Sequence, residues 1–315
     1  KNLVVFVKLF KLGKLSLVKM EILFLGTSSM VPTKERNHSG ILIRYKNENI
    51  LVDCGEGTQR QMKIAGAKLT KITKILISHW HGDHVLGVPG LIQSMSASGY
   101  GGKLRIYGPQ RTRDFMKKML EVFAFDNRID IEVNEIKGGK FFENDDFILE
   151  AKQLEHNVPT LGYGLTEKNK RRINLNFIKK AGVPMGPLLG KLQRGKSIIW
   201  KNKKITPENA TNIIKGKKIT IINDTLPCRN ADALAKGSDL VICEATYSSD
   251  MEDKSTKYMH MTAAQAAKLA KKSNAKKLVL THFSARYKDT KDLEKDAKKY
   301  FKNVVCAKDF MNIRL

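Results

Sequence analysis

The residues with the clearest capacity for chemistry form one short cluster, HWHGDH at residues 79–84. Four potential metal ligands fall within six residues, directly after the apolar run KILIS at 74–78. A strand ending there releases the chain into a tight loop, which can turn the first two histidines to one metal ion and the Asp-His pair to a neighbouring ion. Imidazole and carboxylate without thiolate suit Zn²⁺, Mn²⁺ or Fe²⁺. A polar loop that happens to be rich in histidine is a poor alternative, since the whole chain has only 7 histidines.

A metal pair needs more ligands, and three candidates elsewhere share one property: each follows a β-type run. His156 follows FILEAKQLE, Asp224 follows KITIIN and His282 follows KLVLT. Residues just beyond strand ends line the ligand crevice of α/β folds, so four elements can converge on one site. Each residue alone is equally well explained as a capped or core polar group. Beside the histidine cluster, the metal interpretation is favoured.

The elements that must position these residues alternate between strand and helix. Strands are expected at 21–25, 41–45, 49–53, 74–78, 103–107, 129–133, 218–222, 239–243, 277–280 and 303–306. Helices are expected at 58–66, 86–98, 110–122, 229–236, 262–272 and 289–300. One helix start is well marked, because Thr262 and Gln265 form a capping-box pattern. The pattern predicts an α/β protein. Early hairpin-like strands and later β-α-β units favour two packed sheets with helices outside.

Composition indicates a globular chain with a polyanionic partner. The 315 residues, of which 42% are hydrophobic, suffice for one large domain or two small ones. Lys and Arg number 57 against 31 Asp and Glu, a formal charge of +26. Such an excess points to RNA, DNA or an acidic membrane surface. A lysine-rich composition with solvated helix faces is the alternative explanation.

Two segments differ from the rest of the chain. Residues 1–19 are apolar but broken by Lys8, Lys11 and Lys14, so neither a membrane span nor a secretory signal is expected there. We treat them as an extension of unknown role before a catalytic domain at 20–315. Residues 168–204 hold 12 Lys or Arg and no Asp or Glu, with a Gly/Pro cluster at 181–190. This stretch is expected to project from the domain as an insertion without a core of its own.

The cysteines indicate the compartment. No C-x-x-C pair occurs, and three of the four cysteines lie in or beside apolar strand-like runs. They are interpreted as buried thiols of a reducing compartment, which favours the cytoplasm, and not as disulfides or zinc ligands. The four are Cys54, Cys228, Cys243 and Cys306.

H-x-H-x-D-H followed by distant His, Asp and His resembles the metallo-β-lactamase superfamily, which includes lactamases, thioesterases and nucleases. Further motifs resemble the ribonuclease Z family, and their order and spacing match from about Met20 to the C-terminus. These motifs are GTSSMVPTKERN at 26–37, DCGEGTQRQM at 53–62, NDT at 223–225, EATY at 244–247, HMTAAQAA at 260–267 and THFSARY at 281–287. The resemblance implies an αββα sandwich, two packed β-sheets flanked by helices.

The resemblance also implies a ligand set for two Zn²⁺ ions per chain. One ion falls to His79, His81 and His156. The second falls to Asp83, His84 and His282, and Asp224 bridges the two. A bridging carboxylate keeps two ions at the separation typical of phosphodiester-cleaving sites. Asp83 resembles the family's general base.

Other residues carry roles by resemblance alone. His260 matches a histidine that contacts the scissile phosphate and helps to protonate the leaving oxygen, and Glu244 matches the glutamate that orients it. In the alternative interpretation, His260 only caps a helix and Glu244 pairs with a surface lysine. Arg286 is a candidate for holding a phosphate. His38 has no assigned role and is expected to be structural or exposed.

The basic stretch has a counterpart in the family as well. Several ribonuclease Z enzymes carry an arm with a Gly-Pro-rich tip that grips the body of transfer RNA, and a disordered basic loop is the alternative. The matching tip residues are Gly182, Pro184, Gly186 and Pro187.

These features predict a zinc-dependent endoribonuclease that cleaves the 3′ trailer from transfer-RNA precursors. The resemblance further implies a homodimer, and no membrane association is expected. One alternative is a hydrolase of the same fold acting on small phosphodiesters, sulfate esters or thioesters, which would need neither the arm nor the charge. An RNA-binding protein with an inactive metal site is disfavoured, because every expected ligand is present.

Overall fold

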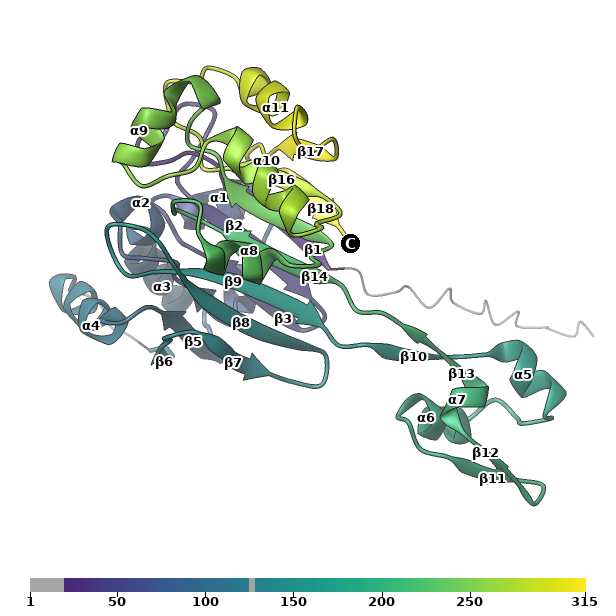
Figure 1. Ribbon diagram of the computed structural model, residues 1–315. Helices are drawn as coiled ribbons and strands as arrows, with labels where there is room; N and C mark the ends of the chain where they lie inside the picture. The colour runs from purple at the N-terminus through teal and green to yellow at the C-terminus, as the bar shows by residue number, and fades with distance from the viewer. Residues whose placement is uncertain (1–19, 125–127) are drawn as a thin grey trace, which may run out of the picture.

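Two seven-stranded sheets lie face to face between outer helices (Figure 1). The computed structural model describes residues 20–124 and 128–315, so the extension predicted at 1–19 lies outside the described residues. The first sheet has the order β18 (Asn312–Arg314), β1 (Glu21–Gly26), β2 (Gly40–Tyr45), β3 (Glu48–Val52), β4 (Lys74–Leu76), β5 (Lys103–Gly108), β6 (Asp130–Glu135). The second has the order β17 (Val304–Cys306), β16 (Leu278–Thr281), β15 (Leu240–Glu244), β14 (Lys218–Ile222), β9 (Thr160–Glu167), β8 (Phe147–Leu154), β7 (Gly139–Glu143).

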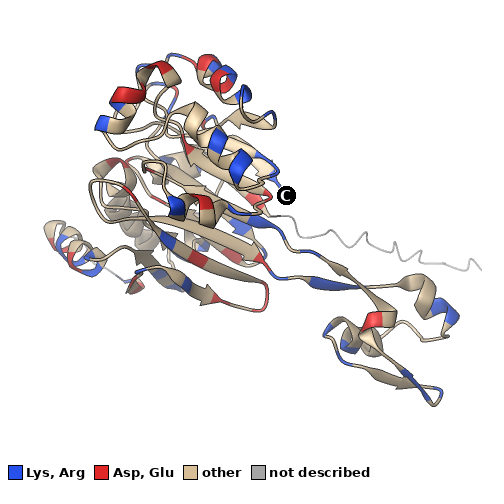
Figure 2. Ribbon diagram, viewed as in Figure 1, with Lys and Arg blue, Asp and Glu red and all other residues tan. Residues whose placement is uncertain are grey.

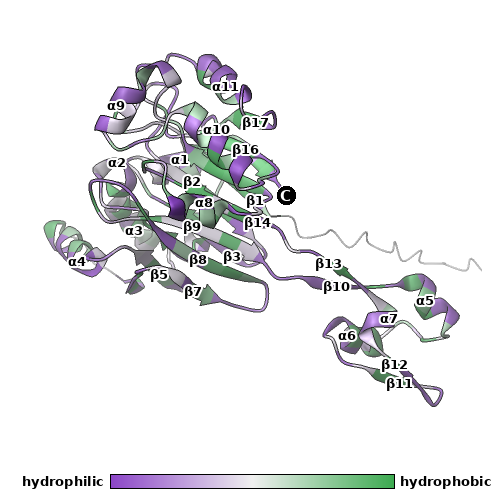
Figure 3. Cartoon of the chain, in the orientation of Figure 1, coloured by the Kyte–Doolittle hydropathy of each residue, from purple (hydrophilic) through white to green (hydrophobic). Residues whose placement is uncertain are grey.

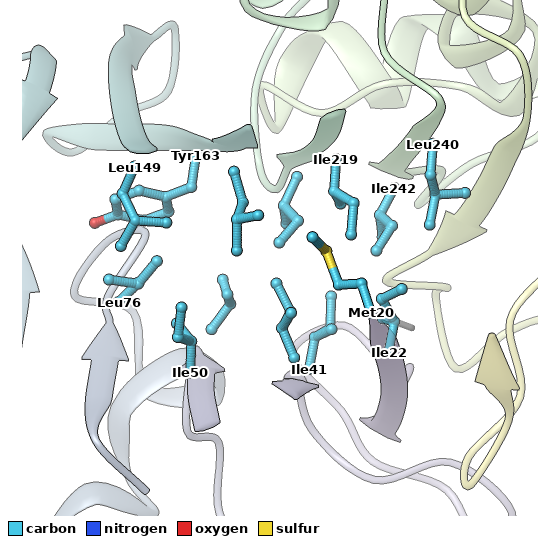
Figure 4. Packing of buried hydrophobic residues seen from close by; sticks show 14 of the residues in the cluster. Met20, Ile22, Ile41, Ile50, Leu76, Leu149, Tyr163, Ile219, Leu240 and Ile242 are labelled. Atoms are coloured by element: carbon cyan, nitrogen blue, oxygen red, sulfur yellow. The ribbon is translucent and has the colours of Figure 1, made fainter. Parts of the chain in front are cut away.

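Alternating apolar side chains bury both faces of each sheet. In β1, Ile22 points into the layer between the sheets, whereas Leu23 points to the outer helices. Figure 4 shows the inner layer, where Ile22 and Ile41 of the first sheet pack with Ile219 of the second. Full burial of one such side chain contributes roughly 1.5–3 kcal/mol. This shared layer therefore holds the two sheets together.

The helices cover the outer faces. The first sheet packs against α1 (Thr58–Ile64), α3 (Val88–Ala97) and α4 (Thr112–Val122). The second packs against α8 (Arg229–Ala235), α10 (Ala263–Lys272) and α11 (Lys291–Lys298). The remaining short elements of the body are η1 (Leu69–Lys71), α2 (Gly82–Val85), η2 (Ser249–Met251) and α9 (Glu252–Lys257).

Parallel strands set the edge at which polar residues collect. In the first sheet β3, β4, β5 and β6 run parallel, and in the second so do β14, β15, β16 and β17. Strands that run parallel end at the same edge of their sheet. The loops after β4, β14 and β16 are therefore close enough to build one site.

The stretch between β9 and β14, residues 168–217, projects away from the body and is called the arm below (Figure 1). A two-stranded ribbon connects it, in which Lys170 pairs with Ile214 and Ile173 with Thr211. The predicted end at residue 204 falls inside this projection, so the boundary is corrected. The arm comprises β10 (Lys170–Ile173), α5 (Leu175–Lys180), α6 (Pro187–Gln193), β11 (Ile198–Trp200), β12 (Lys203–Ile205), α7 (Pro207–Ala210) and β13 (Thr211–Ile214).

The arm also has a small core of its own, contrary to the expectation from sequence. Its buried residues include Ile178, Leu189, Leu192 and Ile198, and the arm carries hydrophobic stretches as the sheets do (Figure 3). Basic side chains dominate its charged residues (Figure 2). The thirteen residues after 204 add one carboxylate, Glu208, whose Oε1 lies 3.2 Å from the Arg171 guanidinium.

Two other expectations can be compared with the described residues. No helix within 20–124 and 128–315 is long and apolar enough to cross a membrane. The four cysteines are free; Cys54, Cys243 and Cys306 are buried as expected, whereas Cys228 is half-buried.

Candidate metal centre

Seven predicted ligands converge where strands of the two sheets end. The loop after β4 and the short helix α2 carry four of them. The other three follow β8, β14 and β16 of the second sheet. Both sheets thus contribute to one cluster, which consists of His79, His81, Asp83, His84, His156, Asp224 and His282.

The first group of ligand atoms comes from His79, His81, His156 and Asp224. His79 Nε2 lies 3.0 Å from His81 Nδ1, which lies 3.4 Å from His156 Nε2. Asp224 Oδ2 lies 3.5 Å from His79 Nε2 and 3.9 Å from His156 Nε2. Atoms held at about 2.0–2.1 Å by a tetrahedral zinc ion lie about 3.3 Å from one another. The spacing fits one such ion.

The second group comes from Asp83, His84 and His282, with Asp224 beside it. His84 Nε2 lies 3.2 Å from His282 Nε2, and each lies 3.4 Å from Asp83 Oδ2. The Nδ1 atoms of both rings contact other groups, Asp53 and Thr246. When those Nδ1 atoms carry the ring protons, two Nε2 lone pairs face each other. A cation between them satisfies both.

Asp224 reaches both groups through its two oxygens. Its Oδ1 lies 3.2 Å from His282 Nε2 of the second group, whereas its Oδ2 lies 3.5 Å from His79 Nε2 of the first group and 3.5 Å from His84 Nε2 of the second. Oδ1 is buried, and no group within residues 20–124 and 128–315 makes a hydrogen bond to it. A buried carboxylate oxygen without a partner carries a free-energy cost that a bound cation removes. The donor set and this orphaned oxygen both fit two metal ions that share Asp224.

Residues outside the ligand set hold the rings in place. Asp53 Oδ2 lies 2.7 Å from His84 Nδ1 and accepts a hydrogen bond from Ser78 Oγ, which lies 3.0 Å from His79 Nδ1. His156 Nδ1 donates to the Met259 carbonyl at 2.9 Å. Such outer partners fix ring orientation and tautomer. Asp53 and Ser78 each end an expected strand, a signal that could have found both.

In the first ligand group the electrostatics suit neutral imidazole ligands beside ionised carboxylates. Burial lowers the pKa of His79, His81 and His156, which favours the metal-binding form. Burial would raise the pKa of Asp83 and Asp224, but the histidines beside them hold both pKa values below the usual range. These three histidines therefore favour the neutral form that metal binding requires. At His84 burial would also lower the pKa, but the carboxylates of Asp224, Asp53 and Asp83 raise it well above the usual value, so a metal ion would have to displace a proton there.

His260 and Glu244 form a pair at the edge of the cluster. His260 Nδ1 lies 3.1 Å and 3.2 Å from the two Glu244 oxygens, and Glu244 is fully buried. Glu244 also accepts hydrogen bonds from the Thr225 amide and the Thr246 hydroxyl. No lysine of residues 20–124 and 128–315 forms an ion pair with it, which contradicts the alternative of a surface pair. Thr262 caps α10 through the predicted capping box with Gln265, so His260 is not the cap.

The pKa of His260 reflects this pair. Burial would lower it, but the carboxylates of Glu244 and Asp224 raise the pKa to about 9. Because both Glu244 oxygens lie on Nδ1, Nε2 is the nitrogen left to face the cavity that His260 lines. The imidazole is thus placed to carry a proton at that atom.

The cavity over the cluster has a volume of about 270 Å³. Ligands of both groups form its floor, among them His81, Asp83 and His282. Asn157, Tyr247 and other side chains surround them. The ligands can therefore be reached by a substrate.

Comparison with known proteins places the chain. It is 40% identical to the ribonuclease Z of Methanothermobacter thermautotrophicus over 94% of this chain and 97% of that protein. The chain belongs to the ribonuclease Z family. It is also 38% identical to the ribonuclease Z of Archaeoglobus fulgidus, over 94% of this chain and 97% of that one.

Solved structures agree with this ribonuclease Z assignment. The short form of human tRNase Z superimposes with a TM-score of 0.69 at 29% identity, over 93% of this chain and 98% of that one. The metallo-β-lactamase fold protein YhfI of Bacillus subtilis gives 0.70 at 17% identity, over 94% and 99%. The predicted metallo-β-lactamase fold is therefore confirmed. A family model described as anti-Pycsar protein Apyc1 matches residues 20–169, less than half of this ribonuclease Z family chain.

The remaining predicted residues lie outside the cavity. Arg286 is exposed; its Cζ lies 5.1 Å from the ring centroid of Tyr247, which lines the cavity. His38 is buried and its Nε2 contacts the Met30 carbonyl at 3.0 Å. The predicted tip residues Gly182, Pro184, Gly186 and Pro187 lie in the arm, around the start of α6.

Proposed function

We propose that this chain is a metal-dependent endoribonuclease that cleaves the 3′ trailer from transfer-RNA precursors by phosphodiester hydrolysis. The observation that carries the proposal is the pair of ligand groups joined by Asp224, whose buried Oδ1 has no hydrogen-bond partner in the described part of the chain. Relatives at 38–40% identity bear the name ribonuclease Z, and the human structural neighbour is a tRNase Z.

Two Zn²⁺ ions per chain are the cofactors that this donor set suits best. His79, His81 and His156 would hold one ion, and Asp83, His84 and His282 the other, with Asp224 shared. When bound, two such ions lower the pKa of a water molecule and neutralise charge on the phosphate. The absence of thiolate in the set agrees with a catalytic rather than a structural zinc site.

The chain's own side chains handle the protons. Asp83, which the histidines beside it keep ionised, is assigned by resemblance to the family as the base that accepts a proton from the attacking water. His260 delivers a proton through Nε2 to the leaving oxygen, while Glu244 on Nδ1 fixes the ring and its protonated state. This is the arrangement of a general acid with an orienting carboxylate.

The arm and the charge of +26 support a transfer-RNA precursor as the partner. RNA duplexes are recognised largely by shape and backbone contacts, which a basic projection can make. We assign binding of the transfer-RNA body to the arm tip, at Gly182, Pro184, Gly186 and Pro187. We assign binding of a phosphate near the cavity to Arg286. A homodimer in the cytoplasm is part of the same proposal. A small-ester hydrolase is disfavoured because it would have no use for the arm.

The decisive experiment is incubation of zinc-loaded protein with a transfer-RNA precursor extended at its 3′ end, with mapping of both products. We expect one cut at the base of the trailer and no cleavage after chelation. Unchanged precursor, or cuts scattered along the RNA, would refute the proposal.

A further inference from the structure

Two large hydrophobic side chains stand exposed on the lining of the metal cavity. Tyr258 is 52% exposed and Met30 is 65% exposed. Within residues 20–124 and 128–315, no other exposed large hydrophobic residue lines this cavity. Neither residue belongs to a ligand group or to the His260–Glu244 pair.

The backbone around Tyr258 is tied to the metal centre. The residue is the C-cap that follows α9, and its amide donates to the Lys254 carbonyl at 3.0 Å. Met259, next in the chain, has φ +56, a conformation that is costly for a side chain other than glycine. Its carbonyl accepts the hydrogen bond of the ligand His156 at 2.9 Å, and His260 follows directly. The strained turn therefore fixes the position of the Tyr258 backbone relative to His156 and His260.

The turn is also fastened to α9. The His260 amide donates to the Ser255 carbonyl at 2.9 Å, and the Ser255 hydroxyl donates to the His260 carbonyl at 2.6 Å. A ring whose backbone is fixed so closely loses little further freedom when a ligand covers it. Lys257 Nζ lies 5.8 Å from the centroid of the Tyr258 ring, so a cation stands beside this aromatic surface.

An exposed aromatic ring with a neighbouring cation, on the rim of a phosphodiester-cleaving cavity, suits an unpaired nucleobase. Proteins hold single-stranded RNA by stacking bases on aromatic side chains while basic groups follow the backbone. We propose that Tyr258, with Met30 on the same rim, binds the unpaired nucleobase next to the scissile phosphate. The inference rests on the proposed function, because it requires a single-stranded RNA trailer at this cavity.

Base stacking accounts for the expected size of the effect. Tyr258→Ala should lower kcat/KM for a 3′-extended precursor by roughly 5- to 100-fold, the range for loss of one base–aromatic stack. Tyr258→Phe and Tyr258→Trp keep an aromatic face and should stay close to the parent protein. Tyr300→Ala is the matched control, since Tyr300 is 40% exposed, has Lys268 Nζ 4.8 Å from its ring centroid and does not line the cavity.

Precursors that lack one base identify the nucleobase that stacks on the Tyr258 ring. An abasic nucleotide is placed on one side or the other of the scissile phosphate, and each precursor is tested with the parent protein and with Tyr258→Ala. At one of the two positions, the abasic change should slow the parent protein about as much as the substitution does. It should then add little to the slowing in Tyr258→Ala. Metal content and melting temperature are measured for each variant as controls. Hydrolysis of a small aryl phosphodiester is not a suitable control here, because its aryl group could itself stack on the ring.

The outcomes separate this inference from the function on which it rests. If the parent protein does not cut the precursor, the proposed function fails and the base site fails with it. If the parent cuts but Tyr258→Ala cuts equally fast, only the base site is refuted. Independent effects of substitution and abasic change at both positions also overturn it. So does a loss of metal or of subunit association in Tyr258→Ala that accounts for the slowing.

Discussion

Asp224 is the residue on which both ligand groups depend. Its Oδ1 lies beside His282 and its Oδ2 lies beside both His79 and His84, and Oδ1 accepts no hydrogen bond from the described residues. Asp224→Ala should therefore reduce bound zinc from about two ions per chain to fewer than one. The reason is that a bridging carboxylate is a ligand of both ions in a two-metal site. Metal analysis after gel filtration measures this. Asp289→Ala, which removes an exposed carboxylate that belongs to neither ligand group and does not line the cavity, should keep both ions. Two ions retained in Asp224→Ala would contradict the shared-ligand assignment.

His260 is expected to act on protons and not on metal. His260→Ala should keep its metal content yet cleave precursor about 10²–10⁴-fold more slowly, the usual contribution of a general acid. Its Nδ1 lies 3.9 Å from Asp224 Oδ2, close enough for ligation to be a real alternative. Metal loss in the variant would make His260 a ligand, and an unchanged rate would leave it with no catalytic role.

Glu244 should show its effect in the pH dependence of cleavage. A general acid works while protonated, so activity falls as the pH rises through its pKa. The Glu244 carboxylate raises the pKa of His260, opposing burial, which lowers it. In Glu244→Gln the pKa of His260 should drop, and the alkaline loss of activity should begin at lower pH than in the parent protein. A pH–rate profile of kcat/KM tests this, and an unmoved alkaline limb would contradict the role of Glu244.

At the residue scale, the sequence predicted which residues form the ligand cluster. It did not predict the hydrogen-bond partners that hold these ligands in place. Ligands that follow strands carry a local signal, and all seven lie in one cluster. The contacts of Asp53 with Ser78, His84 and Asn223 depend on how β3, β4, α2 and β14 approach one another. Nothing in the local pattern encodes that approach. Tyr258 escaped notice for the same reason, since its exposure is visible only in the fold.

Among the elements, the root of the arm is the most constrained. Glu167, at the end of β9, contacts the Tyr45 hydroxyl and Lys170 Nζ through Oε1, and its Oε2 accepts from the Lys217 amide at 3.2 Å. Gly216 passes so close that a Cβ there would lie 1.9 Å from the Glu167 carbonyl oxygen. Both strands of the connection are thus fixed to one point of the body, which sets the direction of the arm.

Gly216→Ala should therefore misdirect the arm. Linked contacts raise affinity by about 10²–10⁴ only while their geometry allows both to form, so we expect precursor binding to weaken about tenfold or more. Cleavage of bis-nitrophenyl phosphate should change little, because no ligand lies in the arm. Gly190→Ala is the control within the arm, since its nearest atom would be 3.5 Å from the new Cβ. Equal behaviour of the two variants would show that the root does not orient the arm.

Helices and strands of the body were largely predictable because their signals are local. The capping box of Thr262 and the apolar runs of the parallel strands are examples. The limit of the arm was missed because the pairing of β10 with β13 joins residues about 40 positions apart. Its small core was missed because Ile178, Leu189 and Leu192 are scattered among lysines and arginines.

For the whole molecule, the charge of +26 should appear as salt dependence. Replacing residues 169–216 by a short Gly/Ser linker should weaken precursor binding and flatten its salt response. If the arm engages about four phosphates, the logarithmic slope should fall by roughly three to four units. Hydrolysis of bis-nitrophenyl phosphate should persist. Equal loss on both substrates would mean that the arm supports the fold, and equal retention would mean that it does not bind RNA.

Because both sheets contribute ligands to the metal cluster, metal binding should affect the stability of the folded protein. Each ion would take two ligands from the segment after β4, in the first sheet, and two from segments that follow strands of the second sheet. Each ion would therefore cross-link the two sheets. The unfolded chain has no such site, and saturation at a hundred times the dissociation constant adds about 2.7 kcal/mol per site. Zinc supply would then govern how long each copy survives proteolysis, and scarcity would remove the enzyme itself as well as its activity.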